Sequence, residues 1–250
     1  MFGLQDFQPL DKGIPVPLYY QLKKQILAAI EGGRLQVGAM LPTESELCEG
    51  LGISRPTIRQ ALSELVSEGY LYRLKGKGTF VAQPKIDGHF FQKLESFNQE
   101  MLAKGLTPST QVLHLGLVPA SDRIAERLGL AVGEPLLQLT RLRFADGEPI
   151  VYLDTYLPHA RFPGLEARDF VNCSLYAILE RDYAVRVSRV QRRIESVNAT
   201  AQESEVLRCA KNAALCLVKT VAYTAENEPV EYSAARYRGD RNQFTVDLYR

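Results

Sequence analysis

The sequence predicts an α+β chain of two domains, and three observations lead to this prediction. Residues 17–66 carry apolar side chains at three- and four-residue spacing, which is typical of amphipathic helices. The C-terminal part mixes short helical patterns with hairpins instead of regular βαβ units. A short polar stretch containing Pro84 and Gly88 lies between the two patterns, as a linker would. The predicted organisation is a first domain over residues 1–82, a linker over 83–89 and a second domain over 90–250.

The composition excludes several other classes of protein. The 250 residues are 46% hydrophobic and 24% charged, which is an ordinary globular composition. The N-terminus lacks the basic and apolar regions of a signal peptide, and no apolar run is long enough to span a bilayer. The four cysteines form no CxxC pair, which indicates reduced thiols rather than a metal site. We therefore expect a cytoplasmic protein with no membrane association, no cofactor and no metal.

The chain is predicted to begin with a loose arm over residues 1–16, because prolines and a glycine interrupt it. Pro17 then starts a helix that ends at Gly32-Gly33 and has apolar residues along one side. Lys23 and Lys24 lie on this helix. They suit contact with phosphate and an ordinary solvated face equally well, so both interpretations stay open.

A second and a third helix form the centre of the first domain. Thr43 and Glu46 have the spacing of a capping box and start a short helix. After a tight turn, Ser54 caps a helix whose apolar side chains share one stripe. Its opposite face presents Arg55 and Arg59 near the N-terminal end, where a recognition helix meets base edges in a major groove. The pair of helices predicts a helix-turn-helix.

Two β-like runs, residues 70–74 and 79–81, are joined by Lys75-Gly76-Lys77-Gly78. A basic turn that contains glycine can closely approach a phosphate backbone or a minor groove. Residues 55–77 hold five basic and two acidic side chains, a balance of +3 in a chain whose net charge is +1. The preceding helix and this local charge favour a DNA-binding winged helix over a solvated helix with an ordinary hairpin.

Residues 17–26 and 41–81 resemble the DNA-binding domain of GntR-type bacterial transcription regulators. The matching motifs are the Pro-Thr-Glu helix start at 42–44, Ser-Arg-Pro-Thr-Ile-Arg-Gln-Ala-Leu at 54–62 and Gly-Lys-Gly-Thr-Phe-Val at 76–81. The family often has Arg where this chain has Ser45, so one DNA contact is missing or weakened here. The residues predicted to contact DNA are Thr43, Ser45, Arg55, Thr57, Arg59, Lys75, Gly76 and Lys77.

The second domain is predicted to be an antiparallel sheet with helices. Helices are expected over residues 90–103, 121–128, 174–181 and 200–208. Strands are expected over 112–117, 136–144, 150–157, 185–197, 215–224, 230–237 and 244–249. Asp146-Gly147 marks a hairpin, and ion pairs of Arg238, Asp240 and Arg241 are expected to fix the sheet edge.

Arg141 and Arg143 are two residues apart, so on a strand they share one face. Two guanidinium groups facing a cavity would bind phosphate or carboxylate, whereas on a solvated face they would have no such role. Ser174, at a helix start, suits both an anion contact and simple capping.

Residues 90–250 resemble the effector-binding UTRA domain of the HutC subfamily, which folds like chorismate lyase. The matching motifs are Leu94–Phe97, Thr140–Arg143, Gly147–Ile150, Ser174–Tyr176, Glu231-Tyr232 and Tyr237–Phe244. In members that sense phosphorylated sugars, the resemblance implies that the Arg pair, the Ser and the Tyr hold the phosphate, and that Ser96 and Phe97 supply backbone donors. It places Glu231 and Tyr237 near the sugar. The candidate effector-binding residues are Ser96, Phe97, Arg141, Arg143, Ser174, Tyr176, Glu231 and Tyr237.

One position departs from this subfamily. Leu153 stands where amino-sugar sensors carry Glu, and strand alternation would turn the neighbouring Asp154 to the other face. The sequence therefore predicts an anion pocket without specifying a sugar.

The predicted function is a one-component, DNA-binding transcriptional regulator of the repressor type. A small anionic metabolite, phosphorylated or carboxylate, would control its affinity for double-stranded operator DNA. A homodimer and a pseudo-palindromic operator are expected, because one winged helix contacts little DNA. A ligand-responsive activator is the alternative. A lyase-like enzyme fused to a DNA-binding domain is disfavoured, because the three histidines are isolated in the sequence and because a shared fold does not imply a shared catalytic activity. An architectural DNA-binding protein would leave the second domain unexplained.

Overall fold

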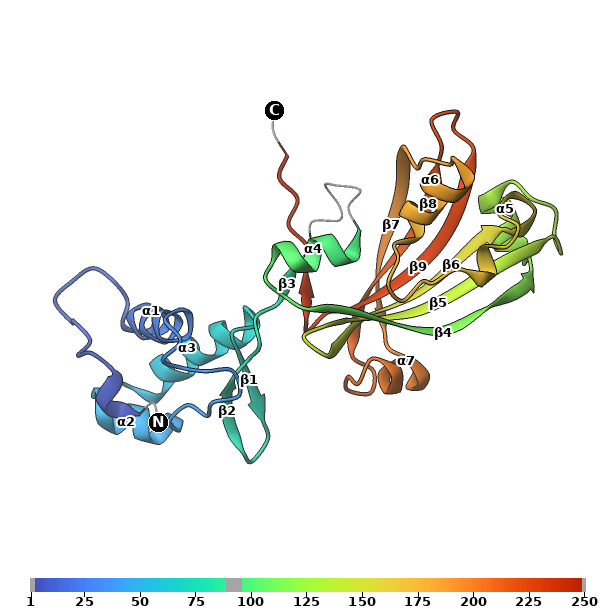
Figure 1. Ribbon diagram of the computed structural model, residues 1–250. Coiled ribbons are helices and arrows are strands. Elements are labelled where there is room, and N and C mark those ends of the chain that lie inside the picture. Colours follow the sequence, from blue (N-terminus) through green and yellow to red (C-terminus); the bar gives the residue numbers. More distant parts are fainter. Residues whose placement is uncertain (1–2, 89–95, 249–250) are drawn as a thin grey trace. The chain divides into compact units, whose positions relative to one another are not determined.

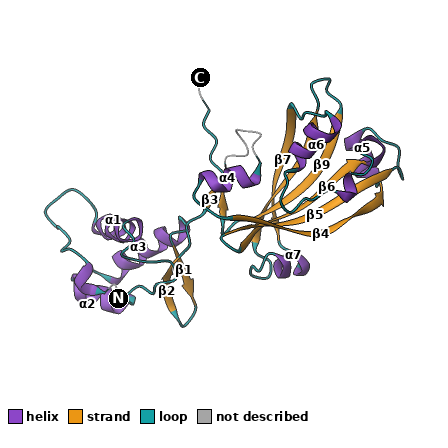
Figure 2. Ribbon diagram, in the orientation of Figure 1, coloured by secondary structure: helices purple, strands orange, loops and turns teal. Residues whose placement is uncertain are grey.

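The computed structural model describes residues 3–88 and 96–248 (Figures 1 and 2). The chain divides into two compact units, Met1–Lys85 and Ile86–Arg250. The division falls inside the segment predicted as a linker. Among the described residues, none of the helices combines the length and the apolarity that crossing a membrane requires.

The first unit is a winged helix-turn-helix, as predicted. Its core is formed by side chains that are fully buried on α1 and α3, among them Leu22, Ile26, Ile58 and Leu65. These are the apolar positions whose helical spacing the sequence shows, so the prediction of an amphipathic helix pair is confirmed. The elements are the short 3-10 helix η1 (Leu4–Asp6), α1 (Leu18–Glu31), α2 (Glu44–Leu51), α3 (Arg55–Ser67), β1 (Leu71–Leu74) and β2 (Gly78–Val81).

The prediction of a loose N-terminal arm was wrong for residues 4–11, whereas residues 12–15 are exposed bends. Phe7 is only 8% exposed and belongs to the core of the unit, and Leu4 and Leu10 pack against that core. Backbone N–H groups of the arm also donate to Gln21 and Gln25 on α1, over 2.9 and 2.8 Å. The arm docks because its apolar residues recur at every third position, a pattern that its prolines obscure.

The open question about Lys23 has a structural answer. Its ammonium group contacts the carboxylates of Glu64, at 3.0 Å, and Glu68, both near the C-terminal end of α3. These two partners raise the pKa of Lys23. Lys23 therefore ties α1 to α3. Lys24 instead lies over the ring of Tyr20, 5.7 Å from its centre.

The second unit is built on a six-stranded antiparallel sheet with the strand order β4-β5-β6-β9-β8-β7. The turn between β5 and β6 is the predicted Asp146-Gly147 hairpin, where both residues have positive φ. The antiparallel sheet with helices confirms the predicted fold class. The strands are β4 (Pro108–Pro119), β5 (Pro135–Ala145), β6 (Glu148–Pro158), β7 (Arg189–Asn198), β8 (Ala214–Tyr223) and β9 (Pro229–Arg238).

Helices cover both faces of this sheet. One face carries α4 (Phe97–Ala103) and α6 (Leu175–Tyr183), which pack on clusters that contain alternate residues of the strands, such as Leu139 and Val151. The other face carries α5 (Asp122–Leu128) and α7 (Ala201–Val206). The short 3-10 helices η2 (His159–Arg161) and η3 (Leu165–Ala167) follow β6. The helix expected over 90–103 is observed from Phe97 onward, and residues 90–95 lie outside the described part.

A short parallel strand pair joins the two ends of the second unit. β3 (Ile86–Asp87), from the predicted linker, pairs with β10 (Asn242–Gln243). Asp87 also accepts hydrogen bonds from the backbone N–H and the hydroxyl of Thr245, at 3.1 and 2.9 Å. The strand predicted over 244–249 was wrong for the described residues, because 244–248 follow β10 without sheet pairing. The predicted ion pairs are present and join Arg238 to Asp240 and Glu148, and Arg241 to Glu148. They lie at the ends of the inner strands β6 and β9 and not at an edge strand, as was predicted.

Candidate functional site

The N-terminal end of α3 presents polar side chains outward while its other face is buried. Ser54 caps the helix, accepting a hydrogen bond from the N–H of Thr57, and Pro56 occupies the first turn. Ile58 is fully buried, whereas the Arg59 side chain is 65% exposed. Helical geometry thus turns Arg59 to solvent at the end of α3 that a recognition helix uses.

Two predicted DNA contacts are joined to each other. The guanidinium of Arg55 donates to the hydroxyl of Ser45 over 2.8 Å, which links α3 to α2. Ser45 occupies the position where GntR-type regulators often have Arg. In this chain its hydroxyl orients Arg55. Thr43 caps α2, because its hydroxyl and backbone N–H form a capping box with Glu46.

Glu44 is a residue of this surface that the sequence reasoning missed. Its carboxylate lies 3.8 Å from Nε of Arg59 and 3.5 Å from Nη2 of Arg73. It therefore holds an arginine of α3 and an arginine of β1 on the same side. The Pro-Thr-Glu motif was the available signal, but it was interpreted only as a helix start.

The hairpin tip completes this surface. β1 and β2 pair as far as Leu74 and Gly78, and Gly76 adopts φ +74° in the turn between them. A side chain at this φ would be strained, which explains the glycine. Lys75 and Lys77 flank it and are exposed. Through Glu44 and the Arg55–Ser45 bond, the structure brings the starts of α2 and α3 together with β1.

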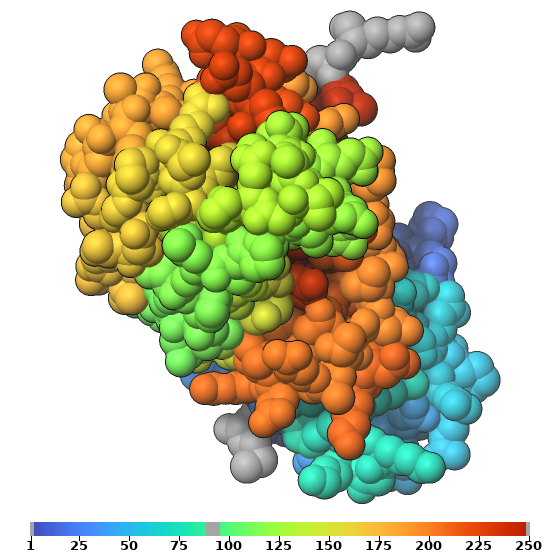
Figure 3. Space-filling view, turned by 90° about the vertical axis from the view of Figure 1, so that its right-hand side faces the viewer, coloured from blue at the N-terminus to red at the C-terminus, as the bar shows by residue number. Residues whose placement is uncertain are grey.

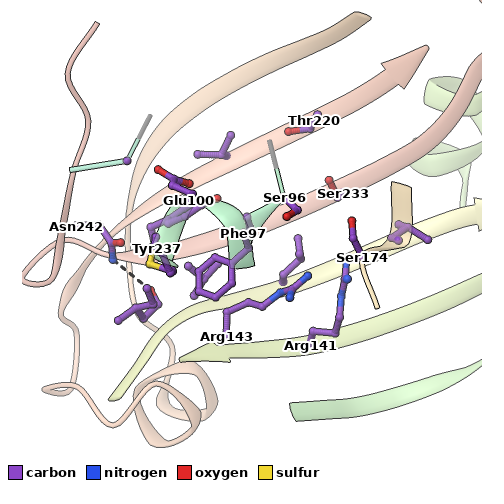
Figure 4. Close-up of a pocket in the computed structure, with 18 of the residues that line it drawn as sticks. Ser96, Phe97, Glu100, Arg141, Arg143, Ser174, Thr220, Ser233, Tyr237 and Asn242 are labelled. Atoms are coloured by element: carbon purple, nitrogen blue, oxygen red, sulfur yellow. Dashed lines mark hydrogen bonds between the residues drawn. The ribbon is translucent and has the colours of Figure 1, made fainter. Parts of the chain in front are cut away.

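A separate cavity of about 160 Å³ lies in the second unit, between the sheet and helices α4 and α6 (Figure 4). Strands β5, β6 and β9 form its base. All eight residues predicted to bind an effector line it: Ser96, Phe97, Arg141, Arg143, Ser174, Tyr176, Glu231 and Tyr237.

The two arginines of β5 lie in this cavity rather than on a solvated face. Arg141 is 3% exposed and donates one hydrogen bond, to Thr155 at 3.3 Å, while Arg143 donates to Thr110 at 2.7 Å. Among the described residues, Nε and Nη1 of Arg141 and Nε of Arg143 have no hydrogen-bond partner. Burial lowers the pKa of Arg141 to about 10, which Glu231 counteracts, and burial together with Arg141 lowers that of Arg143 to about 9. Both side chains are therefore cationic at neutral pH.

The residues around the arginines complete a polar lining. The guanidinium carbon of Arg143 lies over the ring of Phe97, 5.1 Å from the ring centre. Ser174 precedes α6 without a side-chain capping bond, and Figure 4 shows it beside Arg141. Ser96, in contrast, caps α4, and its backbone N–H already donates to Gln99. Its predicted role as a backbone donor therefore requires that this bond be released.

Glu231 and Tyr237 lie beside different arginines. Glu231 acts electrostatically on Arg141, whereas Tyr237 does so on Arg143. Burial, the charge of Glu231 and a hydrogen bond to it raise the pKa of Tyr176 well above its usual value. Glu231 therefore interacts with both Arg141 and Tyr176.

The strand alternation expected around Leu153 holds. Leu153 lines the cavity, while Asp154 accepts from Thr140 at 2.8 Å and pairs with Arg236 at 3.0 Å. Asp154 does not line the cavity, so it cannot replace a carboxylate at position 153.

Several lining residues were missed. Ser233 could have been found, because it shares the alternation of Glu231 and Tyr237 on β9, and Thr220 is its partner on β8. Others come from distant parts of the chain that no local pattern joins. The missed polar and charged residues are Glu100, Arg192, Thr220, Ser233 and Asn242.

A second hollow of about 220 Å³ involves α5, β7, β8 and β9 (Figure 3). In this view it lies between the green surface of α5 and the orange surface of β7. Arg123, Arg127 and Arg193 line it and are exposed to solvent, while Lys219 is paired with Glu195 at 2.8 Å. These cations are hydrated or neutralised, which distinguishes them from the buried arginines of β5. In the described part of the chain, no cluster of His, Cys, Asp and Glu is arranged to hold a metal ion.

Comparison with known proteins identifies the family of each unit. Residues 18–81 match the model of the gntR family of bacterial regulatory proteins, and residues 103–243 match the UTRA domain. The chain is 36% identical over 235 residues to the HTH-type transcriptional repressor NagR of Bacillus subtilis, covering 94% of this chain and 96% of that protein.

Two further similarities span most of the chain. It is 28% identical to the probable fructoselysine utilization operon transcriptional repressor of Escherichia coli K12, over 92% of this chain and 94% of that protein. The crystal structure of PhnF from Mycobacterium smegmatis superposes with a TM-score of 0.66 at 29% identity, covering 92% and 98% of the two chains. The chain thus belongs to the gntR family of DNA-binding bacterial regulatory proteins, with a UTRA domain as its second unit.

Proposed function

We propose that this regulator is a repressor whose affinity for operator DNA is lowered by a small anionic effector bound in the UTRA cavity. The observation that carries the proposal is the pair of arginines on β5, Arg141 buried and Arg143 half-buried, whose buried N–H groups have no partner among the described residues. Similarity to the repressor NagR and to the probable fructoselysine operon repressor supports the repressor assignment. A repressor must reach the chromosome, which supports a cytoplasmic location.

The arginines argue for an anion on energetic grounds. A buried charge is costly unless it is paired, and a buried donor without an acceptor adds about 1–3 kcal/mol. A phosphate or carboxylate would accept from Arg141 and Arg143 at once and offset both costs. We propose a phosphorylated sugar or a small organic acid as the effector. The fructoselysine relative favours a ligand derived from a sugar, and Leu153 argues against one that needs a carboxylate for its ammonium group at that position.

The cavity lining includes the first residues of the second unit. Ile86 and Gly88 line it, and Ile86 directly follows Lys85, the last residue of the first unit. A ligand would therefore contact the β3 segment that continues into the DNA-binding unit. We propose residues 82–88 as the hinge through which the effector selects one arrangement of the units. Such coupling typically changes affinity by about 5- to 150-fold.

The test is operator affinity measured with and without candidate anions. Operator fragments are first selected from genomic DNA by binding, and a panel of sugar phosphates and organic acids is then titrated at constant ionic strength. We expect at least one anion to weaken operator binding by about 5- to 150-fold. Stronger binding with an anion would make the protein an effector-dependent binder instead. If every anion left the affinity unchanged, the cavity would not be an effector site.

We further propose a homodimer that binds a pseudo-palindromic operator. A single winged helix presents a small DNA contact surface, and two-fold protein symmetry supplies two half-sites. Sedimentation of the full chain at micromolar concentration should give a dimer, and footprinting should show two related half-sites. A monomer in sedimentation together with a single protected half-site would contradict this proposal.

The exposed lysines of the hairpin tip give a prediction for the DNA-binding unit. Lys75→Ala combined with Lys77→Ala should weaken binding to operator and to random DNA alike, because phosphate contacts carry no sequence information. The slope of log affinity against log salt should become shallower by about two, one for each lost phosphate contact. Titrations at several salt concentrations measure it. An unchanged slope would place the hairpin tip away from DNA.

A further inference from the structure

We propose that the N-terminal arm, residues 3–16, is a further part of the DNA interface, in which Lys12 contacts the phosphate backbone beside the recognition helix. The match to the gntR family begins at residue 18, so the arm lies outside the part of the chain that the family model covers. The inference depends on DNA binding by the first unit, which the family membership establishes, and it is independent of the proposed effector.

The arm runs from α2 to the start of α1 along the first unit (Figure 1). Leu4 packs on α2 at Gly50, where an added Cβ atom would come within 2.8 Å of the Leu4 side chain. The absence of a side chain at Gly50 therefore makes room for the arm. Farther along, the side-chain amide of Gln21, on α1, donates to the backbone carbonyl of Asp11 over 2.7 Å. Contacts with both helices thus fix the backbone that precedes Lys12.

This path places the Lys12 side chain at the turn between α2 and α3. Its ammonium group donates to the backbone carbonyl of Gly52, the residue that caps the C-terminal end of α2, over 3.4 Å. A cation is favoured beside the C-terminal carbonyls of a helix, which explains this position. Gly52 lies two residues before Ser54, the N-cap of α3, and all three residues are exposed. Lys12 is therefore held close to the start of the recognition helix.

The positive charge of Lys12 is available to a ligand. Lys12 forms no ion pair with any residue that the structure describes, and its hydrogen bond to Gly52 is long. Exchanging such a bond for one to a phosphate oxygen costs little. The two acidic side chains of the arm, Asp6 and Asp11, instead accept backbone N–H groups of the arm itself, each over 2.7 Å.

The turn before a recognition helix lies beside the DNA backbone. When the N-terminal residues of that helix contact base edges, the preceding helix crosses the backbone, so the turn between them borders it. Lysine side chains at such places bind phosphate and fix the register of the protein without reading the sequence. Lys12 would thus add one phosphate contact for each bound protomer, at the flank of a half-site.

The experiment compares Lys12→Ala with wild type in titrations of operator and random DNA at several salt concentrations. Each lost phosphate contact makes the slope of log affinity against log salt shallower by about 0.9. The affinity advantage of the wild type should therefore shrink about threefold per bound protomer between about 50 and about 200 mM salt, equally for both DNAs. Lys211→Ala is the matched control, because Lys211 is an exposed lysine of the second unit, and it should keep the wild-type slope.

A second measurement tests proximity instead of energy. A photoreactive benzoylphenylalanine in place of Lys12 should crosslink to operator DNA beside each half-site, and one in place of Lys211 should not. An unchanged salt slope in Lys12→Ala, or a missing crosslink from position 12, would overturn the contact. A loss of affinity confined to the operator would also overturn it, because phosphate contacts carry no sequence information.

Discussion

Arg143→Ala should abolish the response of operator binding to the effector while leaving operator affinity without effector nearly unchanged. Arg143 shares the cavity with Arg141, and its unpartnered Nε is available to an anion. Loss of one of the two arginines removes a charge-assisted hydrogen bond to the anion, which bulk water cannot replace inside the cavity. The effect is large, because the full coupling factor of about 5- to 150-fold should fall to one at the effector concentration that saturates the wild type.

The measurement is operator affinity with and without the effector identified by the anion panel, for wild type and variant. Arg193→Ala is the matched control, since Arg193 is an exposed arginine of the same unit in the second hollow. Arg143→Lys keeps the charge but loses the planar fork, and should respond only at higher effector concentration. A full response of Arg143→Ala at the wild-type concentration would place the site elsewhere. Loss of operator binding without effector would make Arg143 structural.

Arg59→Ala should weaken operator binding strongly and flatten the base preference at one position of each half-site. The side chain is exposed at the start of α3 and is held by Glu44. An arginine that bonds a guanine edge contributes about 1–3 kcal/mol of discrimination. The proposed dimer would lose that contact twice, so the loss over two half-sites should be about 2–6 kcal/mol.

Binding to a library of operator variants measures both affinity and base preference. Arg34→Ala is the matched control, because Arg34 is an exposed arginine of the same unit that lies in the connection between α1 and α2. It should keep the base preference of the wild type. Equal loss of affinity for all sequences in Arg59→Ala would reassign Arg59 to a phosphate. Unchanged affinity and preference would mean that α3 is not the recognition helix.

The parts of the fold that follow local patterns were predictable from the sequence. The apolar stripe of α3, the hairpin at Asp146-Gly147 and the shared face of Arg141 and Arg143 all depend on residues a few positions apart. The same alternation separates Leu153 from Asp154. The resemblance to a known family then predicted eight residues of one cavity. Residue spacing alone could not decide whether Arg141 and Arg143 face a cavity or solvent.

What remained unpredicted depends on contacts between distant residues. β3 pairs with β10 across most of the second unit, and no local pattern of two residues identifies such a strand. Phe7 is buried because the arm packs on the core of the first unit, which distant residues form. The position of Glu231 beside Arg141 and Tyr176 results from the register of β9 in the sheet, which a motif does not contain.

The pairing of β3 with β10 has a consequence for folding of the nascent chain during translation. The first unit ends at Lys85, so it can fold while the ribosome is still translating the rest. Asn242 and Phe244 line the cavity and are synthesised long after Lys85. At about 5–20 residues per second, roughly 8–30 s separate the two events. During that interval, a nascent regulator would have its DNA-binding unit and no means of sensing its ligand.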